Sequence, residues 1–183
     1  MSVAPYQAVL FDLDGTLLDT APDLAGAIND MRLERGLAPM PLAELAPLCS
    51  FGGRGMLGKG LDLRPEDDDY SAAYDAFIET YRGRMTRDTR AYDGMRELVR
   101  ELTEAGCAWG VITNKMEALA LPLMTHMAFD PAPACVIGDA GRVRQVLLNL
   151  LSNLLGRGGG GRRHRASTLH FAQRGGVHRA GAS

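Results

Sequence analysis

The most informative segment of the chain reads Ala8-Val-Leu-Phe-Asp-Leu-Asp-Gly-Thr-Leu-Leu-Asp-Thr20. Its apolar beginning, residues 8–11, predicts a buried strand of a parallel sheet. Such a strand delivers Asp12 and Asp14 at its carboxyl end, where open α/β sheets bind ligands, and Gly15 then allows a sharp turn. Two carboxylates one residue apart suit a hard-metal site for phosphate chemistry, because one can attack or ligate while the other transfers protons. An ordinary strand-to-turn junction is the alternative.

A second polar strand end lies in the later half of the chain. Residues 107–113 are an apolar run that predicts another buried strand, and Thr113, Asn114 and Lys115 stand at its end. A hydroxyl at a strand end, followed by backbone N–H groups that open a helix, can hold a phosphate oxygen. The same pattern is also typical of an ordinary helix cap.

Between these two strands the sequence predicts only helices. One helix starts at Thr20 as its N-cap and ends at Gly36, with Asp23 near its positive end. Further helices are expected over 41–48, over 55–61 and from Pro65 onward. After Tyr92 strands and helices alternate again, which predicts a parallel sheet with right-handed crossovers: helices over 95–105 and 116–127, and strands over 107–113 and 134–137.

Two charged features of the helical segment have both an ordinary and a functional interpretation. The run Asp67-Asp68-Asp69 could suggest a metal, but acids in the first turn of a helix complement its dipole, and we favour that interpretation. Arg54 lies in the glycine-rich stretch 52–55. It could contact an anionic substrate or be a plain surface arginine, and the residues alone favour neither.

The composition is that of a globular, soluble chain. Of its 183 residues 46% are hydrophobic and 23% charged, and no apolar run approaches the roughly 20 residues that span a bilayer. The N-terminus lacks the pattern of a signal peptide. The three cysteines are odd in number and lack metal-ligand spacing, so we expect reduced thiols in a cytoplasmic protein that does not bind membranes.

The net charge of −2 conceals a split between the two ends of the chain. After residue 140 the sequence has eight arginines, no lysine and no acid, whereas the first 140 residues hold 12 basic and 22 acidic groups. Residues 156–183 are rich in Gly, Arg and His, and we expect disorder there. A basic tail that binds nucleic acid is the alternative. Its single aromatic residue, Phe171, argues against that, because a stacking platform is missing.

Three segments together resemble the haloacid dehalogenase superfamily of phosphohydrolases. The stretch 11–20 resembles the first motif of that superfamily, 109–115 the second, and Tyr92-Asp93-Gly94 the turn that leads back into its core. The resemblance covers roughly residues 6–130 and is strongest to the phosphoglycolate phosphatase and N-acetylmuramic acid 6-phosphate phosphatase groups. It implies an α/β fold: a Rossmann-like parallel sheet core, incomplete here, over 1–18 and 90–140, with an inserted α-helical cap over 19–89.

The resemblance also implies a set of site residues. Asp12 would be the nucleophile that becomes an aspartyl-phosphate, and Asp14 would protonate the leaving oxygen and then activate water. Mg²⁺ would bind Asp12 and the backbone carbonyl of Asp14. Thr113 and the Asn114 backbone would hold the phosphoryl oxygens, and the cap, with Arg54 as a candidate substrate contact, would close over the site.

The chain departs from the pattern of the superfamily in two places. A third-motif lysine is missing, because the only lysines are Lys59 and Lys115, which lie elsewhere. The fourth motif is half visible: residues 134–139 resemble a strand that delivers a metal-binding acid, but Val143 stands where the second acid is expected. Asp139 could complete the Mg²⁺ site or be an acid in an ordinary turn. The sheet would also be unfinished, and an exposed edge predicts association or poor solubility.

A different resemblance follows the third strand. Residues 138–153 look like the asparagine box of histidine-kinase ATPase domains, with Asn149 and Asn153 at the positions that coordinate nucleotide-bound Mg²⁺. The glycine-rich lid motifs of those domains are missing. An amphipathic helix over 141–155 that covers the unfinished sheet is the alternative.

The sequence therefore supports three hypotheses about function. The first is Mg²⁺-dependent hydrolysis of a small phosphomonoester, phosphoglycolate or a sugar phosphate, through an aspartyl-phosphate. The second is a catalytically impaired fragment or binding protein that retains a phosphate pocket. The third and weakest is a nucleotide-binding fusion. The expected partner is a small phosphorylated metabolite, and the sequence predicts neither which one nor the oligomeric state.

Overall fold

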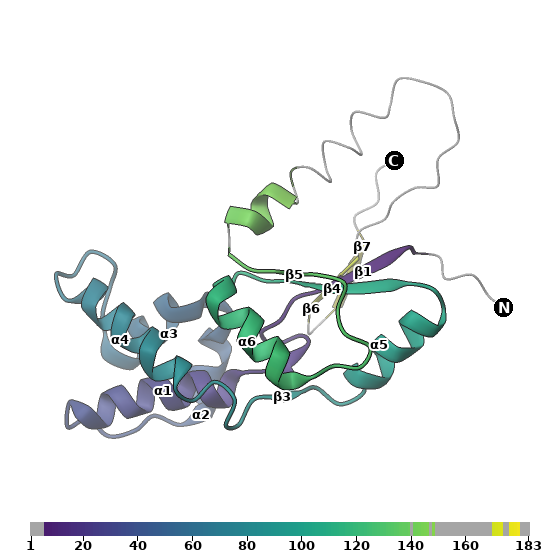
Figure 1. The fold of residues 1–183 in the computed structure, drawn as a ribbon. Coiled ribbons are helices and arrows are strands. Elements are labelled where there is room, and N and C mark those ends of the chain that lie inside the picture. The colour runs from purple at the N-terminus through teal and green to yellow at the C-terminus, as the bar shows by residue number, and fades with distance from the viewer. Residues whose placement is uncertain (1–5, 140, 147, 149–169, 174–175, 180–183) are drawn as a thin grey trace. The chain divides into compact units, whose positions relative to one another are not determined.

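The computed structural model describes residues 6–139, 141–146, 148, 170–173 and 176–179 (Figure 1). Asn149 and Asn153 of the possible asparagine box lie outside the described residues. Most of the helix expected over 141–155 and of the tail expected to be disordered lies outside them as well. None of the helices in the described part is long and apolar enough to cross a lipid bilayer.

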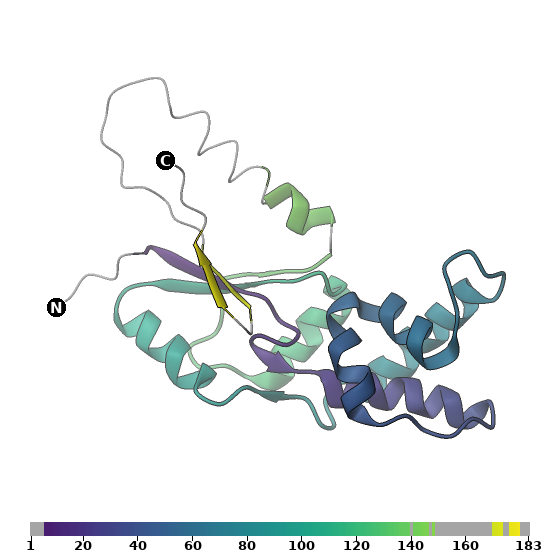
Figure 2. The same cartoon turned by 180° about the vertical axis from the view of Figure 1, so that it is seen from behind.

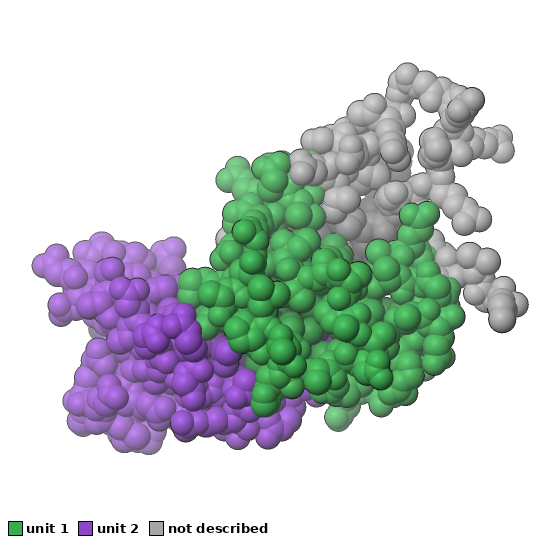
Figure 3. All heavy atoms as spheres, in the orientation of Figure 1, with its two compact units in different colours: residues 1–13, 93–183 green, residues 14–92 purple. Residues whose placement is uncertain are grey.

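The chain divides into two compact units (Figure 3). Residues 1–13 and 93–183 form one, called here the sheet unit, and residues 14–92 form the other, the helical unit. The cap expected over 19–89 lies within the helical unit, and its closing over a site remains a prediction.

The sheet unit contains a parallel sheet of three strands. They are β1 (Ala8–Phe11), β4 (Ala108–Ile112) and β5 (Val136–Ile137), in the order β1-β4-β5. All three strands run in the same direction, so their carboxyl ends share one edge of the sheet. The predicted parallel α/β core is confirmed, and its strand order decides which polar residues can meet.

Two helices connect and cover this sheet. Helix α5 (Met95–Glu104) precedes β4, and α6 (Glu117–Met127) joins β4 to β5. Both lie on the face turned to the viewer in Figure 1 and away in Figure 2, as expected where successive parallel strands are added in one direction. The core below them includes an aromatic row in which Trp109 lies edge-on to its neighbours, Phe11 and Phe129.

A short hairpin also belongs to the sheet unit. Strands β6 (His170–Gln173) and β7 (Gly176–Arg179) pair antiparallel, with Phe171 opposite His178 and Ala172 opposite Val177. Disorder over 156–183 stays a prediction, because these two strands are the part of that segment that the structure describes.

The helical unit begins and ends in a small antiparallel ribbon. Strand β2 (Leu18–Asp19) pairs with β3 (Arg90–Ala91), with Leu18 opposite Ala91 and Asp19 opposite Arg90. The sequence predicts no strand in this segment, because two residues are too few to show an alternating pattern. The helices between the two strands are α1 (Ala21–Glu34), α2 (Leu42–Leu45), the 3-10 helix η1 (Ala46–Phe51), α3 (Gly52–Leu61) and α4 (Tyr70–Arg82).

Helix α1 is the centre of this unit and packs against both α3 and α4. Its buried stripe includes Leu24, Ile28 and Met31. Helix α3 approaches closely at Gly60, where a Cβ atom would lie 2.4 Å from Cγ2 of Ile28. The unit is therefore held by side-chain packing around one helix.

The acidic run before α4 does not lie where the sequence predicts. The helix begins at Tyr70, and Asp69 is its N-cap residue without a side-chain capping bond. Asp67 instead closes a turn before the helix, because its Oδ2 accepts a hydrogen bond of 2.7 Å from the backbone N–H of Arg64. The acids thus shape the approach to α4 rather than its first turn.

Candidate phosphate and metal site

Two polar residues lie at the shared carboxyl edge of the parallel sheet. Asp12 directly follows β1 and is half-buried, and its Oδ1 accepts a hydrogen bond of 2.8 Å from the N–H of Leu13. Thr113 directly follows β4 and is 3% exposed. Since Phe11 lies opposite Val111 and neighbouring strands are about 4.8 Å apart, Asp12 and Thr113 follow the carboxyl ends of two adjacent strands.

The turn after β4 has the groups to hold an oxyanion. The backbone N–H of Thr113 donates to the carbonyl of Ile137 at 2.9 Å, so this group belongs to the sheet. The Thr113 hydroxyl oxygen accepts a bond of 3.2 Å from the N–H of Lys115, and a hydroxyl that accepts in this way can still donate its proton. Asn114 between them is exposed. Helix α6 then begins at Glu117, so its N-terminal N–H groups follow closely.

Asp139 lies at the far side of the sheet from Asp12. It follows β5, which pairs with β4 and not with β1, so two strand spacings of about 4.8 Å separate their chain positions. Its N–H donates to the carbonyl of Lys115 at 3.0 Å. Among the described residues no group of three or more His, Cys, Asp or Glu side chains could hold a metal. The strand order therefore separates Asp139 from Asp12 by the width of β4.

The helical unit holds Asp14 by a side-chain contact. The hydroxyl of Thr20 donates to Oδ1 of Asp14 at 2.7 Å, and Thr20 is 1% exposed. Between them the chain turns tightly: Gly15 has φ +77° and its N–H donates to the carbonyl of Leu18 at 2.9 Å. A positive φ favours glycine, so the predicted turn at Gly15 is confirmed.

The role of Thr20 is a finding that sequence reasoning missed. The sequence predicts Thr20 as the N-cap of the helix that follows, and it occupies that position, but it makes no side-chain capping bond. Its hydroxyl donates a hydrogen bond to Asp14 instead. Both uses need a small hydroxyl residue, so residue type alone cannot distinguish them.

Arg54 lies in the first turns of α3 and is exposed. Helix α4 presents Tyr70 and Tyr74 nearby, with ring centroids 6.1 Å apart. Burial raises the pKa of Tyr70, Tyr74 raises it further, and the charge of Arg54 lowers it, so Arg54 acts electrostatically on Tyr70. A Cβ at Gly53 would lie 2.6 Å from the Tyr74 ring, which explains the glycine beside Arg54. The contact of Arg54 with substrate stays a prediction.

The donor atoms of Asp12 and Asp14 fit a magnesium ion. Carboxylate and carbonyl oxygens are the ligands that Mg²⁺ prefers, and proteins usually hold it by one or two carboxylates together with waters and substrate phosphate. Two aspartates one residue apart supply oxygens of this kind. These residues could thus hold Mg²⁺.

Comparison with known proteins shows to which family the chain belongs. The chain matches the haloacid dehalogenase-like hydrolase family over residues 9–140. It is 38% identical over 135 residues to a phosphoglycolate phosphatase of Xanthomonas campestris pv. campestris (strain 8004), a match that covers 72% of this chain and 59% of that protein. It is 36% identical over 123 residues to an N-acetylmuramic acid 6-phosphate phosphatase of Pseudomonas aeruginosa, covering 67% and 54%. The chain thus spans less than two thirds of the length of these relatives.

Solved structures show the same fold. A predicted phosphoglycolate phosphatase from Haemophilus somnus superposes with a TM-score of 0.68 at 20% identity, over 85% of this chain and 74% of that one. A haloacid dehalogenase-like hydrolase from Streptococcus pneumoniae has a TM-score of 0.61 at 18% identity, over 81% and 71%. With the family match over most of its length, the chain belongs to the haloacid dehalogenase-like hydrolase family.

Proposed function

We propose that this protein hydrolyses a small phosphomonoester with the help of Mg²⁺. The observation that carries the proposal is the placement of Asp12 directly after β1 and of buried Thr113 directly after β4, two paired parallel strands whose carboxyl ends lie side by side. Relatives named phosphoglycolate phosphatase and N-acetylmuramic acid 6-phosphate phosphatase support a phosphorylated hydroxy acid or sugar phosphate as the substrate.

Hydrolysis would proceed in two displacements at phosphorus. A carboxylate oxygen of Asp12 attacks the phosphoryl group, and the bond to the alcohol oxygen breaks while Asp14 gives that oxygen a proton. Water then attacks the aspartyl-phosphate and loses a proton to Asp14, which releases inorganic phosphate and restores the Asp12 carboxylate. The Thr113 hydroxyl and the Asn114 N–H would hold the phosphoryl oxygens throughout.

Magnesium has a defined place in this proposal. When bound, Mg²⁺ would be held by Asp12 and the backbone carbonyl of Asp14 and would offset negative charge on the phosphoryl oxygens. Asp139 has no part in it, because β4 lies between β5 and β1. Arg54, the exposed arginine of α3, would contact an anionic group of the substrate other than the phosphate that reacts.

A phosphate-binding protein without turnover is the second candidate. The observation that favours it is the shortage of lysine: Lys59 forms an ion pair of 3.3 Å with Glu44 in the helical unit, which leaves Lys115 as the only other lysine of the chain. An aspartyl-phosphate carries several negative charges that a nearby cation would stabilise. If Lys115 does not reach the phosphoryl group, phosphate could bind while hydrolysis stays slow.

Phosphate release from a panel of phosphomonoesters decides between the two candidates. We expect release in the presence of Mg²⁺, loss of release with a chelator, and loss in Asp12→Asn. A folded protein that binds inorganic phosphate but releases none from any ester would contradict the hydrolase and support the binding protein.

A further inference from the structure

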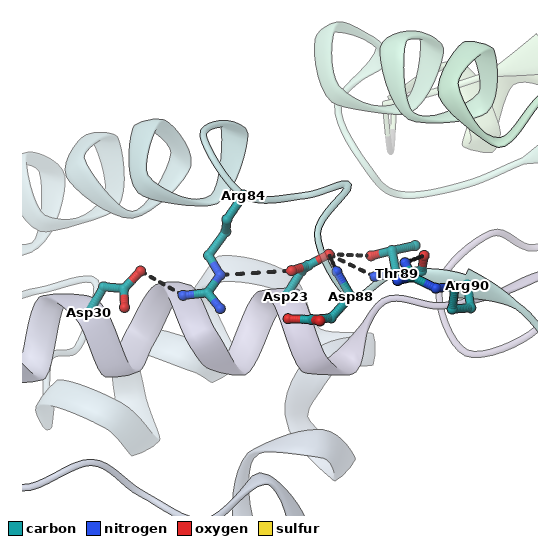
Figure 4. A network of polar contacts seen from close by, with 6 residues as sticks. All are labelled: Asp23, Asp30, Arg84, Asp88, Thr89 and Arg90. Carbon is teal, nitrogen blue, oxygen red and sulfur yellow. Dashed lines mark hydrogen bonds and ion pairs between the residues drawn. The ribbon is translucent and has the colours of Figure 1, made fainter.

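Asp23 is a buried carboxylate in the first turn of α1, with 0% exposure. An acid at this position of a helix ordinarily stays in water and gains only from the helix dipole. Here Oδ2 accepts three hydrogen bonds, from the N–H of Asp88 at 3.1 Å, the N–H of Thr89 at 2.8 Å and the Thr89 hydroxyl at 2.8 Å (Figure 4). Burying a carboxylate without partners costs considerable free energy, and these three hydrogen bonds offset that cost.

Arg84 supplies the positive charge that such a carboxylate needs. Its Nε lies 3.8 Å from Oδ1 of Asp23, and its Nη1 donates to Oδ2 of Asp30 at 2.6 Å (Figure 4). The guanidinium crosses α1 at Gly26, where a Cβ would lie 2.0 Å from Nη2. Asp23, Gly26 and Asp30 thus form one face of α1 that receives Arg84.

The Asp23 contact closes the ribbon of the helical unit. Thr89 directly precedes β3, and β2 ends directly before Thr20. Because Asp19 lies opposite Arg90, Thr20 and Thr89 are the next positions along the two paired chains. Asp23 therefore fastens the first turn of α1 to the chain that enters β3.

Thr20 connects this fastened turn to Asp14. Its carbonyl accepts a hydrogen bond of 3.1 Å from the N–H of Leu24, which belongs to the first turn of α1. Its hydroxyl donates to Oδ1 of Asp14 at 2.7 Å. A displacement of the first turn would therefore move the hydroxyl that holds Asp14.

We infer that Asp23 is a positioning residue for Asp14. By holding the first turn of α1 against Thr89, it keeps the Thr20 hydroxyl within hydrogen-bond distance of the Asp14 carboxylate. It touches neither the substrate nor the reacting atoms. The catalytic consequence rests on the proposed function, in which Asp14 transfers protons, and it concerns protonation of the leaving oxygen rather than attack by Asp12.

The first experiment measures the contact itself, without activity. In the full chain the ¹³C chemical shift of the Asp14 carboxyl carbon reports its hydrogen bond, and Thr20→Val defines the value without that bond. We expect Asp23→Asn to move the shift toward the Thr20→Val value. The control is Asp30→Asn, which removes the outer partner of Arg84 but keeps the Thr89 contacts, and should leave the shift unchanged. An unchanged shift in folded Asp23→Asn overturns the inference.

A second pair of variants covers the case in which Asp23→Asn does not fold. Thr89→Val removes one of the three donors to Asp23, and Thr89→Ser keeps the hydroxyl. We expect Thr89→Val to move the Asp14 shift in the same direction and Thr89→Ser to restore it. Equal shifts in the two Thr89 variants overturn the inference.

Activity then separates positioning from general weakening. Phosphoglycolate has a poor leaving group that needs a proton, whereas p-nitrophenyl phosphate has a leaving group that departs without one. We expect Asp23→Asn to lower kcat/KM about tenfold for the first ester and less than about twofold for the second, because kcat/KM excludes the second displacement, in which Asp14 acts in the same way on both esters. An equal fall for both esters overturns the inference. If the unaltered chain hydrolyses neither, the proposed function fails, and the chemical shift still decides whether Asp23 positions Asp14.

Discussion

The sheet unit and the helical unit place their polar residues by different means. In the sheet unit, Asp12 and Thr113 stand at the ends of strands whose backbone hydrogen bonds fix them, so their positions depend little on any one side chain. In the helical unit, Asp14 is held by the Thr20 hydroxyl, and α1 is tied to Thr89 through Asp23. Single side-chain substitutions should therefore disturb the helical unit more readily than the sheet edge.

The largest expected effect contrasts two aspartates that both lie beside a glycine. Asp14→Asn removes the proposed proton-transfer group, and we expect kcat for an alkyl phosphate to fall by about 10²- to 10⁴-fold. Asp139→Asn should change it less than about twofold, because Asp139 follows the strand that lies beyond β4. Steady-state phosphate release measures both. A large fall in Asp139→Asn would return that residue to the site.

The next effect tests the side chain that holds Asp14. Thr20→Val keeps the shape of a buried residue but loses the hydroxyl that donates to Asp14. We expect kcat for an alkyl phosphate to fall about tenfold, since the proton-transfer group is no longer oriented. Helix α1 should keep its stability apart from about 1 kcal/mol for the lost hydrogen bond, because Thr20 makes no capping bond.

The matched control for this substitution is Thr20→Ser, which keeps the hydroxyl and should retain most of the activity. If Thr20→Ser loses as much activity as Thr20→Val, the hydroxyl is not what matters at this position.

A smaller effect tests the packing of the helical unit. In Gly60→Ala the new methyl group would lie 2.4 Å from Cγ2 of the buried Ile28, so we expect a loss of about 1–3 kcal/mol in the free energy of unfolding. Gly58→Ala on the same helix meets only the carbonyl of Leu63, at 3.8 Å. It should be neutral or stabilising by up to about 1 kcal/mol. Urea unfolding of both variants measures the difference in stability. Equal stabilities would mean that α1 and α3 pack less tightly at Gly60 than the structure shows.

Sequence patterns predict the strands and most helices because these elements are local. The apolar runs of β1 and β4 and the motifs around Asp12 and Thr113 are enough to predict the sheet edge. They do not predict on which side of the β1–β4 pair a later strand will lie, so they cannot predict how far Asp139 lies from Asp12.

Long-range polar contacts are equally invisible in the sequence. Asp23 looks like an acid that complements a helix dipole, because its partner Thr89 lies 66 residues away in the chain. The short strands β2 and β3 give no periodic signal, so nothing indicates that the two segments meet. What the patterns miss in the helical unit is thus what positions Asp14.

The mildest perturbation compares two cysteines within the sheet unit, at the entrances of adjacent strands. Cys107 precedes β4 and is 1% exposed, and burial raises its pKa, whereas Cys135 precedes β5 and is exposed. The thiolate is the form that reacts. A raised pKa lowers the fraction of Cys107 that is thiolate at pH 8, so the labelling of Cys107 should increase only at higher pH. We expect iodoacetamide to modify Cys135 at least about tenfold faster than Cys107, as followed by mass spectrometry of the peptides.

In urea the two rates should converge, since unfolding removes the difference in burial. Equal rates in the native protein would mean that the amino end of β4 opens readily, and backbone hydrogen bonds would then hold the sheet less firmly than the contrast with the helical unit requires.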